Sequence, residues 1–187
     1  MKQRELIDFL NKIEKLKCFT RHSWTSSGRH ESIAEHSWRL AVMAMLVADE
    51  FPKADINKVI KMCLVHDFGE AITGDVPSFY KTEENEQEED KAVENLLNSL
   101  PEKQREELKP LFVEMENMQT VEAKLWKGLD NMEVLIAHNE APISTWIDLE
   151  YKENLTYGAE NVEWSTWLKE LKEEIKREAI EKMDKGL

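Results

Sequence analysis

A histidine and an aspartate stand next to each other at His66 and Asp67, on the apolar face of a segment with helical periodicity. A carboxylate on an apolar face costs several kcal/mol unless a partner compensates its charge. No lysine or arginine lies one turn before Asp67, because Cys63 and Leu64 occupy those positions. A divalent cation would supply the missing charge and would use the adjacent imidazole as a ligand.

Two further side chains suit such a site. His36 shares a helix face with Leu40 and Val47, so its imidazole is expected to point inward, and Asp130 lies beside an apolar helical stripe. Taken alone, a histidine such as His36 is more often a hydrogen-bonded core residue, and an aspartate is more often on the surface. Together the set offers two imidazoles and two carboxylates, which suit Mn, Fe, Co, Ni or Zn better than calcium and leave Mg open.

Helices are expected to position these side chains. Only 6 glycines and 5 prolines interrupt the chain, and the segments between them follow a period of 3.6 residues. Ser32 and Glu35 form a capping box that predicts a helix start just before His36. The sequence therefore predicts an all-α fold, a compact multi-helix bundle, with helices over residues 2–17, 32–51, 55–68, 84–99, 101–117, 120–140 and 160–184.

Two glycines fall in the helices that would carry the site. Gly69 is expected to end helix 55–68 directly after the histidine–aspartate doublet. Gly128 lies inside helix 120–140, where it costs about 1 kcal/mol relative to alanine. Its presence predicts a close approach to another helix or to a ligand.

Length and charge restrict the possible partners. The 187 residues, 41% of them hydrophobic, are enough for one substantial core, so we expect a single domain over residues 1–187. The net charge of −13 disfavours a nucleic-acid polymer, but a local basic pocket could still hold a small anion. Two cysteines are too few for a disulfide framework, and the N-terminal segment has no sustained apolar run. We therefore expect a cytoplasmic protein that does not bind membranes.

The pattern of His36, His66–Asp67 and Asp130 resembles the H…HD…D signature of HD-domain metal-dependent phosphohydrolases. The segments ESIAEHSWRLAVMAM, LVHDFGEAITGDVPSFYK and KGLDNMEVL are similar to those of the small bacterial 5'-deoxynucleotidase branch and its eukaryotic relatives. The resemblance covers about residues 5–140. It implies an HD-domain bundle, a homodimer, and these four residues as ligands of one divalent metal.

The resemblance also assigns residues to the reaction. Glu70 and Asp75 match the catalytic carboxylates of that branch, although either alone would read as an exposed or turn residue. Phosphate ester hydrolysis needs such groups to orient water and to protonate the leaving alkoxide. Arg21 and Lys81 match positions that approach the phosphate, and otherwise they would be surface charges.

One position departs from the family pattern. His22 follows Arg21 where the branch usually has a tryptophan that discriminates the sugar, and Trp24 lies two residues further on. The choice between ribose and deoxyribose is therefore left open by the sequence.

The leading hypothesis is a phosphomonoesterase of the 5'-nucleotidase type that removes phosphate from nucleoside 5'-monophosphates, with deoxynucleotides as the expected substrates. One alternative is an HD hydrolase of another phosphate ester, such as a nucleoside triphosphate, a guanosine polyphosphate or a non-nucleotide phosphate. The other is a non-catalytic nucleotide-binding module. None of the five histidines lies between Asp67 and Asp130, so the extra ligands of two-metal HD enzymes are missing and one metal is expected.

Overall fold

Helices build most of the structure, a computed structural model that describes residues 1–186. In chain order they are α1 (Gln3–Ile13), α2 (Ile33–Leu46), α3 (Ile56–Val65), α4 (Glu70–Thr73), α5 (Glu83–Asn98), α6 (Glu102–Asn117), α7 (Val121–Glu140), α8 (Glu150–Thr156), α9 (Ala159–Val162) and α10 (Thr166–Lys185). Short 3-10 turns are η1 (Glu14–Lys17), η2 (Ala48–Glu50), η3 (Ser78–Tyr80) and η4 (Ile143–Thr145). Strands β1 (Thr20–Trp24) and β2 (His30–Ser32) pair as a small antiparallel hairpin. The predicted all-α fold class is confirmed, with this hairpin as an addition.

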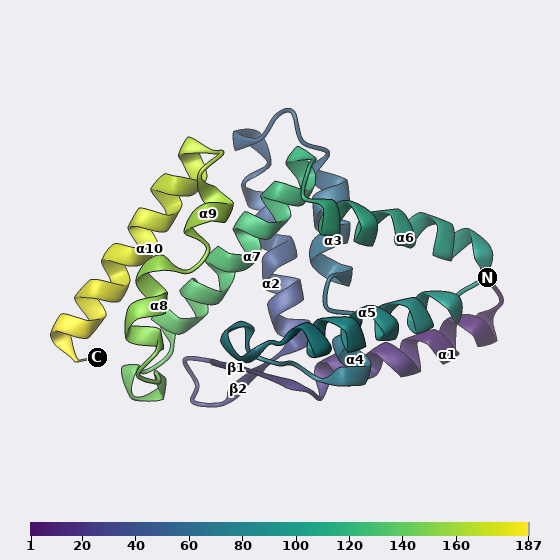
Figure 1. Cartoon of the computed structure of the whole chain (residues 1–187), viewed down its shortest axis with the longest axis horizontal. Coiled ribbons are helices and arrows are strands. Elements are labelled where there is room, and N and C mark those ends of the chain that lie inside the picture. The colour runs from purple at the N-terminus through teal and green to yellow at the C-terminus, as the bar shows by residue number, and fades with distance from the viewer. Residues whose placement is uncertain (187) are drawn as a thin grey trace.

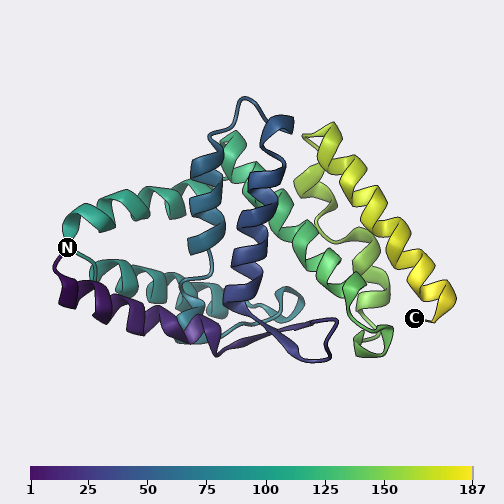
Figure 2. The same ribbon diagram turned by 180° about the vertical axis from the view of Figure 1, so that it is seen from behind.

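Helices α2, α3 and α7 pack against one another at the centre of the fold (Figures 1 and 2). Fully buried apolar side chains fill the space between them, among them Leu40, Met62 and Leu129. Burial of a side chain of this size contributes about 1.5–3 kcal/mol. The predicted metal ligands lie on these helices or directly after them, so the packing of the core sets their relative positions.

The start of α2 is fixed by the predicted capping box. Ser32 Oγ accepts a hydrogen bond from the Glu35 backbone N–H at 3.2 Å, and the Glu35 carboxylate accepts one from the Ser32 backbone N–H at 2.8 Å. Asp55 and Thr120 cap α3 and α7 in the same way, each accepting from a backbone N–H three residues later. All three helices that surround the site therefore begin at side-chain caps.

Helix α7 packs with its other side against α10. A Cβ atom at Gly128 would lie 3.0 Å from Leu168 Cδ1 and 3.2 Å from the carbonyl oxygen of Asn161. The close approach predicted from this glycine is confirmed, and the neighbours are protein segments.

The prediction that this helix continues through His66 and Asp67 and ends at Gly69 is wrong. Helix α3 ends at Val65, so His66 and Asp67 lie in the turn that follows it, and the chain continues through Gly69 into α4. Gly69 has helical backbone angles, and its role is space: a Cβ atom there would lie 2.7 Å from Glu89 Cγ on α5. This glycine lets α4 rest directly on α5.

The expected helix 160–184 is divided in the structure. Helix α9 ends at Val162, and Ser165 caps a new helix, α10, by accepting from the Leu168 backbone N–H. Helix α8 and turn η4 lie in residues for which no element was predicted, since both are too short for a clear period.

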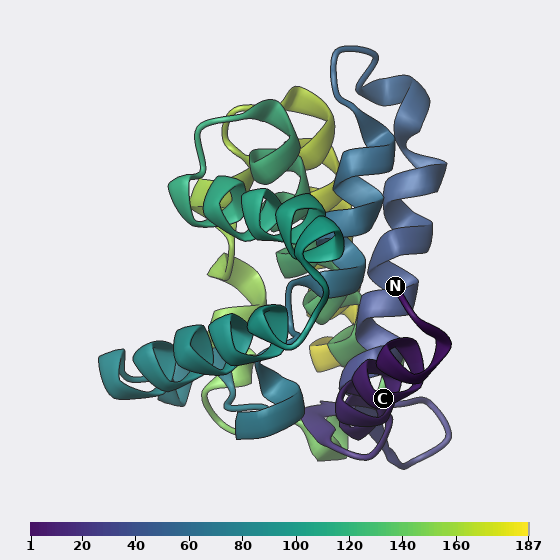
Figure 3. The same cartoon turned by 90° about the vertical axis from the view of Figure 1, so that its right-hand side faces the viewer.

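Helices α5 and α6 form a V whose open side faces α7 (Figures 1 and 2). Figure 3, viewed from the side on which these two helices lie, shows α6 above α5. A cavity of about 720 Å³ opens among these helices, β1, α7 and α8. Within residues 1–186, no helix combines the length and the apolar character needed to cross a membrane.

Candidate metal centre

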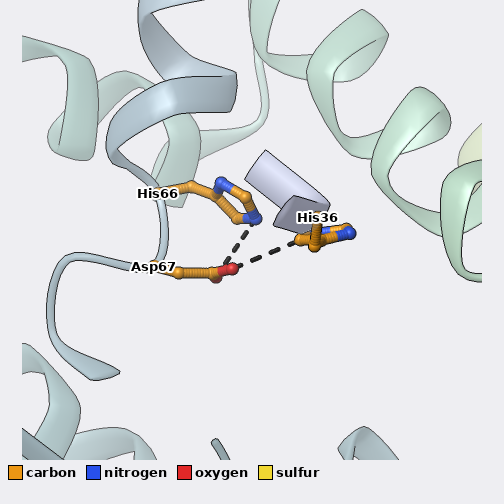
Figure 4. Close-up of side chains that lie close together, drawn as sticks. All are labelled: His36, His66 and Asp67. Carbon is orange, nitrogen blue, oxygen red and sulfur yellow. Dashed lines mark ion pairs between the residues drawn. The ribbon is translucent and has the colours of Figure 1, made fainter. Parts of the chain in front are cut away.

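The structure brings the four predicted metal ligands together beside this cavity, which is lined by three of them, His66, Asp67 and Asp130. His36 Nε2 lies 3.1 Å from Asp130 Oδ1 and 4.0 Å from Asp67 Oδ2. His66 Nε2 lies 3.1 Å from Asp67 Oδ1 and 3.6 Å from Asp130 Oδ1. Figure 4 shows the two imidazoles and the Asp67 carboxylate pointing toward one another. Ligand atoms from three separate segments therefore meet at one point.

Each imidazole is oriented through its other ring nitrogen. His66 Nδ1 donates a hydrogen bond to the carbonyl oxygen of Cys63 at 2.9 Å, and His36 Nδ1 donates to a carboxylate oxygen of Glu133. These two bonds take up Nδ1, so Nε2 is the atom that each imidazole offers to a metal ion. Metal-binding histidines are commonly held by a carbonyl or carboxylate in this way.

The donor set fits a divalent cation. His36, His66 and Asp67 each offer a ligand atom, and these atoms all lie within 4.8 Å of one another. Asp67 Oδ2 is buried and has no hydrogen-bond partner among residues 1–186. A buried carboxylate oxygen without a hydrogen-bond partner needs positive charge nearby. A metal ion would supply that charge, and Arg21 contributes to it, because its Nη1 lies 3.6 Å from Asp67 Oδ2.

The charges in the centre are strongly perturbed. Burial opposes ionisation of Asp130, but Lys127 and the hydrogen bonds from the imidazoles hold the pKa of its carboxyl well below the usual range. Burial and Arg21 lower the pKa of His36, but Glu133 and Asp130 outweigh them and raise it to about 9. At these two residues the neighbouring charges therefore outweigh burial and favour the charged form.

Glu70 and Asp75 lie beside the metal centre as carboxyls outside the ligand set. Glu70 is only 5% exposed, and its Oε2 has no hydrogen-bond partner within residues 1–186. Burial, together with repulsion from Asp67 and Asp75, raises the pKa of Glu70 to about 10. Burial also raises the pKa of Asp75, while Arg21 opposes the shift.

Arg21 connects these groups. Its Nη1 lies 4.0 Å from Asp75 Oδ1 as well as 3.6 Å from Asp67 Oδ2, and only 13% of its side chain is exposed. Burial works against the guanidinium charge, but Asp67 and Asp75 raise the pKa of Arg21, so it stays a cation. Lys81 lines the same cavity, and its ammonium pairs with Glu89 on α5.

Sequence reasoning missed two charged neighbours of Asp130. Glu133 is fully buried and accepts from His36 Nδ1 and from Arg39 Nε, the latter at 2.6 Å. Lys127 Nζ lies 2.9 Å from Asp130 Oδ2. Both stand three residues from Asp130 on α7, so the spacing of helix neighbours was a signal that could have found them.

The chain matches a family model described as an HD domain over residues 13–172. It is 34% identical to a human 5'-deoxynucleotidase, HDDC2, over 153 residues, which cover 80% of this chain and 72% of that protein. It is 32% identical to the 5'-deoxynucleotidase hdd1 of Schizosaccharomyces pombe over 142 residues, or 72% of this chain and 71% of that protein.

Solved structures agree with the family match. A protein from Magnetospirillum magnetotacticum, described as a "Predicted metal-dependent phosphohydrolase", superposes with a TM-score of 0.78 at 28% identity. The match covers 95% of this chain and 92% of that one. The resemblance inferred from the H…HD…D pattern is confirmed, and the chain belongs to the HD domain family.

Proposed function

We propose that this protein is a metal-dependent phosphohydrolase that removes the phosphate from nucleoside 5'-monophosphates. The observation that carries the proposal is the convergence of two imidazole Nε2 atoms and two carboxylates beside a large cavity, next to a half-buried arginine. The names of the relatives, which are 5'-deoxynucleotidases, support deoxynucleotides as substrates.

We assign His36, His66, Asp67 and Asp130 as the ligands of one divalent cation. When bound, such a cation supplies Lewis acidity to water and to a phosphoryl oxygen. The mixed N/O donor set favours Mn, Fe, Co, Ni or Zn, with Mg as a further candidate. The hydrogen bonds at both Nδ1 atoms support this assignment, because they hold the Nε2 lone pairs toward the ion.

The remaining groups handle the phosphate and the protons. Arg21 holds the phosphate, since a guanidinium can donate two parallel hydrogen bonds to it. Lys81 adds positive charge at the cavity wall. Glu70 and Asp75 together orient the attacking water and protonate the leaving 5'-oxygen. Glu70 is buried and Asp75 is half-buried, and Asp75 Oδ1 lies 4.0 Å from Nη1 of Arg21, the proposed phosphate-binding group.

The same proposal includes a single cytoplasmic domain over residues 1–187 that acts as a homodimer. The family resemblance is the basis for the dimer. Light scattering after size-exclusion chromatography tests it directly, and a monomer mass at micromolar concentration would contradict it.

The test of function is a substrate panel with metal-loaded protein. Purified protein is analysed for metal content, loaded with Co²⁺ or Mn²⁺, and assayed for phosphate release from ribo- and deoxyribonucleoside 5'-monophosphates. Nucleoside triphosphates, a guanosine polyphosphate and a non-nucleotide phosphate ester complete the panel. Preferred release from 5'-monophosphates supports the proposal. Preference for another ester, or no release by protein with full metal content, overturns it.

A further inference from the structure

Arg21 reaches the metal centre from the small hairpin, and a buried glutamate lies beside it on the neighbouring strand. Thr20 on β1 pairs with Ser32 on β2, and Arg21 and Glu31 are the next residues on the two strands. Residues opposite each other on antiparallel strands project to the same face. Accordingly, Glu31 Oε2 lies 3.7 Å from Arg21 Nε. The proposed mechanism does not use Glu31.

The two edges of the Arg21 guanidinium face different groups. Nη1 lies near Asp67 and Asp75, and Arg21 itself lines the cavity. Nε faces Glu31, which is only 6% exposed and is not among the residues that line the cavity. Glu31 therefore approaches the arginine from within the protein, where a ligand in the cavity does not touch it.

Both atoms of this pair lack a hydrogen-bond partner. Arg21 Nε and Glu31 Oε2 are buried, and neither forms a hydrogen bond within residues 1–186. They are a donor and an acceptor, and a shift of about 1 Å would bring them to an ordinary hydrogen-bond distance. A buried donor or acceptor without a partner is costly. The pair therefore favours an orientation in which Nε turns toward Glu31 and the Nη atoms stay at the cavity.

The charges around Glu31 also favour its pairing with Arg21. Glu31, His36 and Glu133 each have a side-chain N or O atom within 4.8 Å of the others, but Glu133 is already paired with His36 and Arg39. Burial and repulsion from Glu133 raise the pKa of Glu31 to about 7, and Arg21 is the largest of the charges that oppose this rise. Within residues 1–186, Arg21 is also the one side chain that forms an ion pair with Glu31.

We propose that Glu31 is a positioning residue for the substrate phosphate, holding the Nε edge of Arg21 so that both Nη groups face the phosphate in the cavity. The inference rests on the proposed function, in which Arg21 binds the phosphate. A guanidinium in a fixed orientation presents two parallel donors to a phosphate. Misplacement of a substrate-binding group by about 1 Å can slow an enzyme about 100-fold.

The first test is Glu31→Gln in the metal-loaded protein, with dAMP as the substrate. The amide keeps the size of the side chain but removes the charge that attracts the guanidinium. We expect KM to rise about tenfold or more and kcat to change less than about threefold, because Arg21 binds the phosphate equally in the ground state and the transition state. Metal content should stay at the wild-type level.

Glu35→Gln is the matched control for Glu31→Gln. Glu35 lies four residues further on and also pairs with an arginine, Arg29, but 42% of its side chain is exposed and it forms no ion pair with Arg21 within residues 1–186. Its KM for dAMP should stay within about twofold of the wild-type value, since an exposed pair away from the cavity does not orient the phosphate. A wild-type KM in Glu31→Gln would overturn the inference.

A double-mutant cycle shows whether Glu31 acts through Arg21. Arg21→Ala should raise KM at least as much as Glu31→Gln does, and the combined variant should be no worse than Arg21→Ala alone. If Glu31 served only the fold, its substitution would lower activity further in the Arg21→Ala protein. Independent losses that multiply in the double variant would therefore contradict a positioning role.

Glu31→Asp guards against poor folding of the glutamine variant. It keeps a negative charge near Arg21 but withdraws the carboxylate by one methylene group, so the buried charges remain balanced. We expect KM to rise severalfold, while the midpoint of urea unfolding stays close to that of wild type. A wild-type KM for this variant would also contradict the inference, because it would mean that the distance between the two groups has no effect.

Binding without turnover separates this inference from the proposed function. Calorimetry with the metal-loaded Glu70→Gln protein measures the affinity for dAMP directly. If wild type releases no phosphate, but Glu31→Gln weakens dAMP binding in the Glu70→Gln protein and not in the Glu70→Gln/Arg21→Ala protein, the proposed function fails and the inference holds. If wild type hydrolyses dAMP and the affinity does not depend on Glu31, the proposed function holds and the inference fails.

Discussion

Two polar clusters beside the same cavity hold their side chains in opposite ways. At the metal centre, His36 and His66 are each fixed through Nδ1, and the carboxylates lie beside cationic side chains. The second cluster consists of His22, His138, Glu150 and Asn154, and we call it the polar wall; there, Asn154 Nδ2 has no partner among the described residues. Prealigned charges suit an ion, whose position must be exact, whereas free hydrogen-bonding groups suit a ligand that arrives with its own donors and acceptors.

The largest expected effect comes from removing a ligand of the metal centre. Asp67→Asn keeps the size of the side chain but removes the charge that balances a cation, so bound metal should fall below one tenth per protein and phosphate release should become undetectable. Metal analysis and the nucleotide assay check this. The exposed Asp49→Asn variant is the matched control. Full metal content in Asp67→Asn would remove Asp67 from the ligand set.

Glu70→Gln should separate chemistry from metal binding. The substitution keeps the shape of the side chain and removes its ability to give or take a proton, so kcat should fall by about 10²–10⁴-fold, the range for a lost general acid or base. Metal content should stay at the wild-type level, because Glu70 is outside the ligand set. Loss of metal together with activity would instead make Glu70 a ligand.

The hydrogen bond between Glu133 and His36 gives the next largest expected effect, on metal affinity. Glu133→Gln weakens the hold on the imidazole and should raise the metal dissociation constant about 10–100-fold, the usual size for such an outer contact. Glu140→Gln is a close control, because Glu140 also pairs with Arg39 but does not contact His36. Titration with Co²⁺, followed by its absorption spectrum, measures both variants. Equal affinities would show that Glu133 serves the fold alone.

The metal centre could be predicted from the sequence because its residues lie on or next to long helices. The period of the apolar residues places His36 and Asp130 on inner faces, and the capping box sets where α2 begins. The sequence did not reveal that Arg21 approaches Asp67, because residues 46 positions apart meet only through tertiary packing. The roles of these residues stay predictions for the experiments above.

The polar wall could not be predicted, because its residues lie in segments without a clear hydrophobic period and meet only through tertiary packing. Its members come from the irregular strand β1, the end of α7 and the short helix α8, none of which has a strong period at that point. His22 attracted notice only as a departure from a family pattern. No pattern in the sequence singles out Glu150 or Asn154, and only the fold shows that both are buried.

The smallest effect concerns the start of α2, which carries His36. Hydrogen bonds from Arg29, then from the Ser32 backbone, lower the pKa of Glu35 to about 2. A depressed pKa means that the charge of Glu35 stabilises the fold above its ordinary value near 4.5, and that this stability is lost as pH falls toward 2. Because 42% of the side chain is exposed, screening limits the contribution to about 0.5–1 kcal/mol.

Glu35→Gln isolates that charge, since the amide oxygen can still accept from the Ser32 backbone N–H. Urea unfolding should show the variant less stable than wild type by this amount at pH 7, and the gap should narrow at pH 4. An Arg29→Gln double-mutant cycle assigns the difference to the ion pair, because the second substitution should cost little once Glu35 is neutral. If the difference in stability between wild type and variant stays constant or widens in acid, the charge of Glu35 does not stabilise the start of α2, the helix that carries His36.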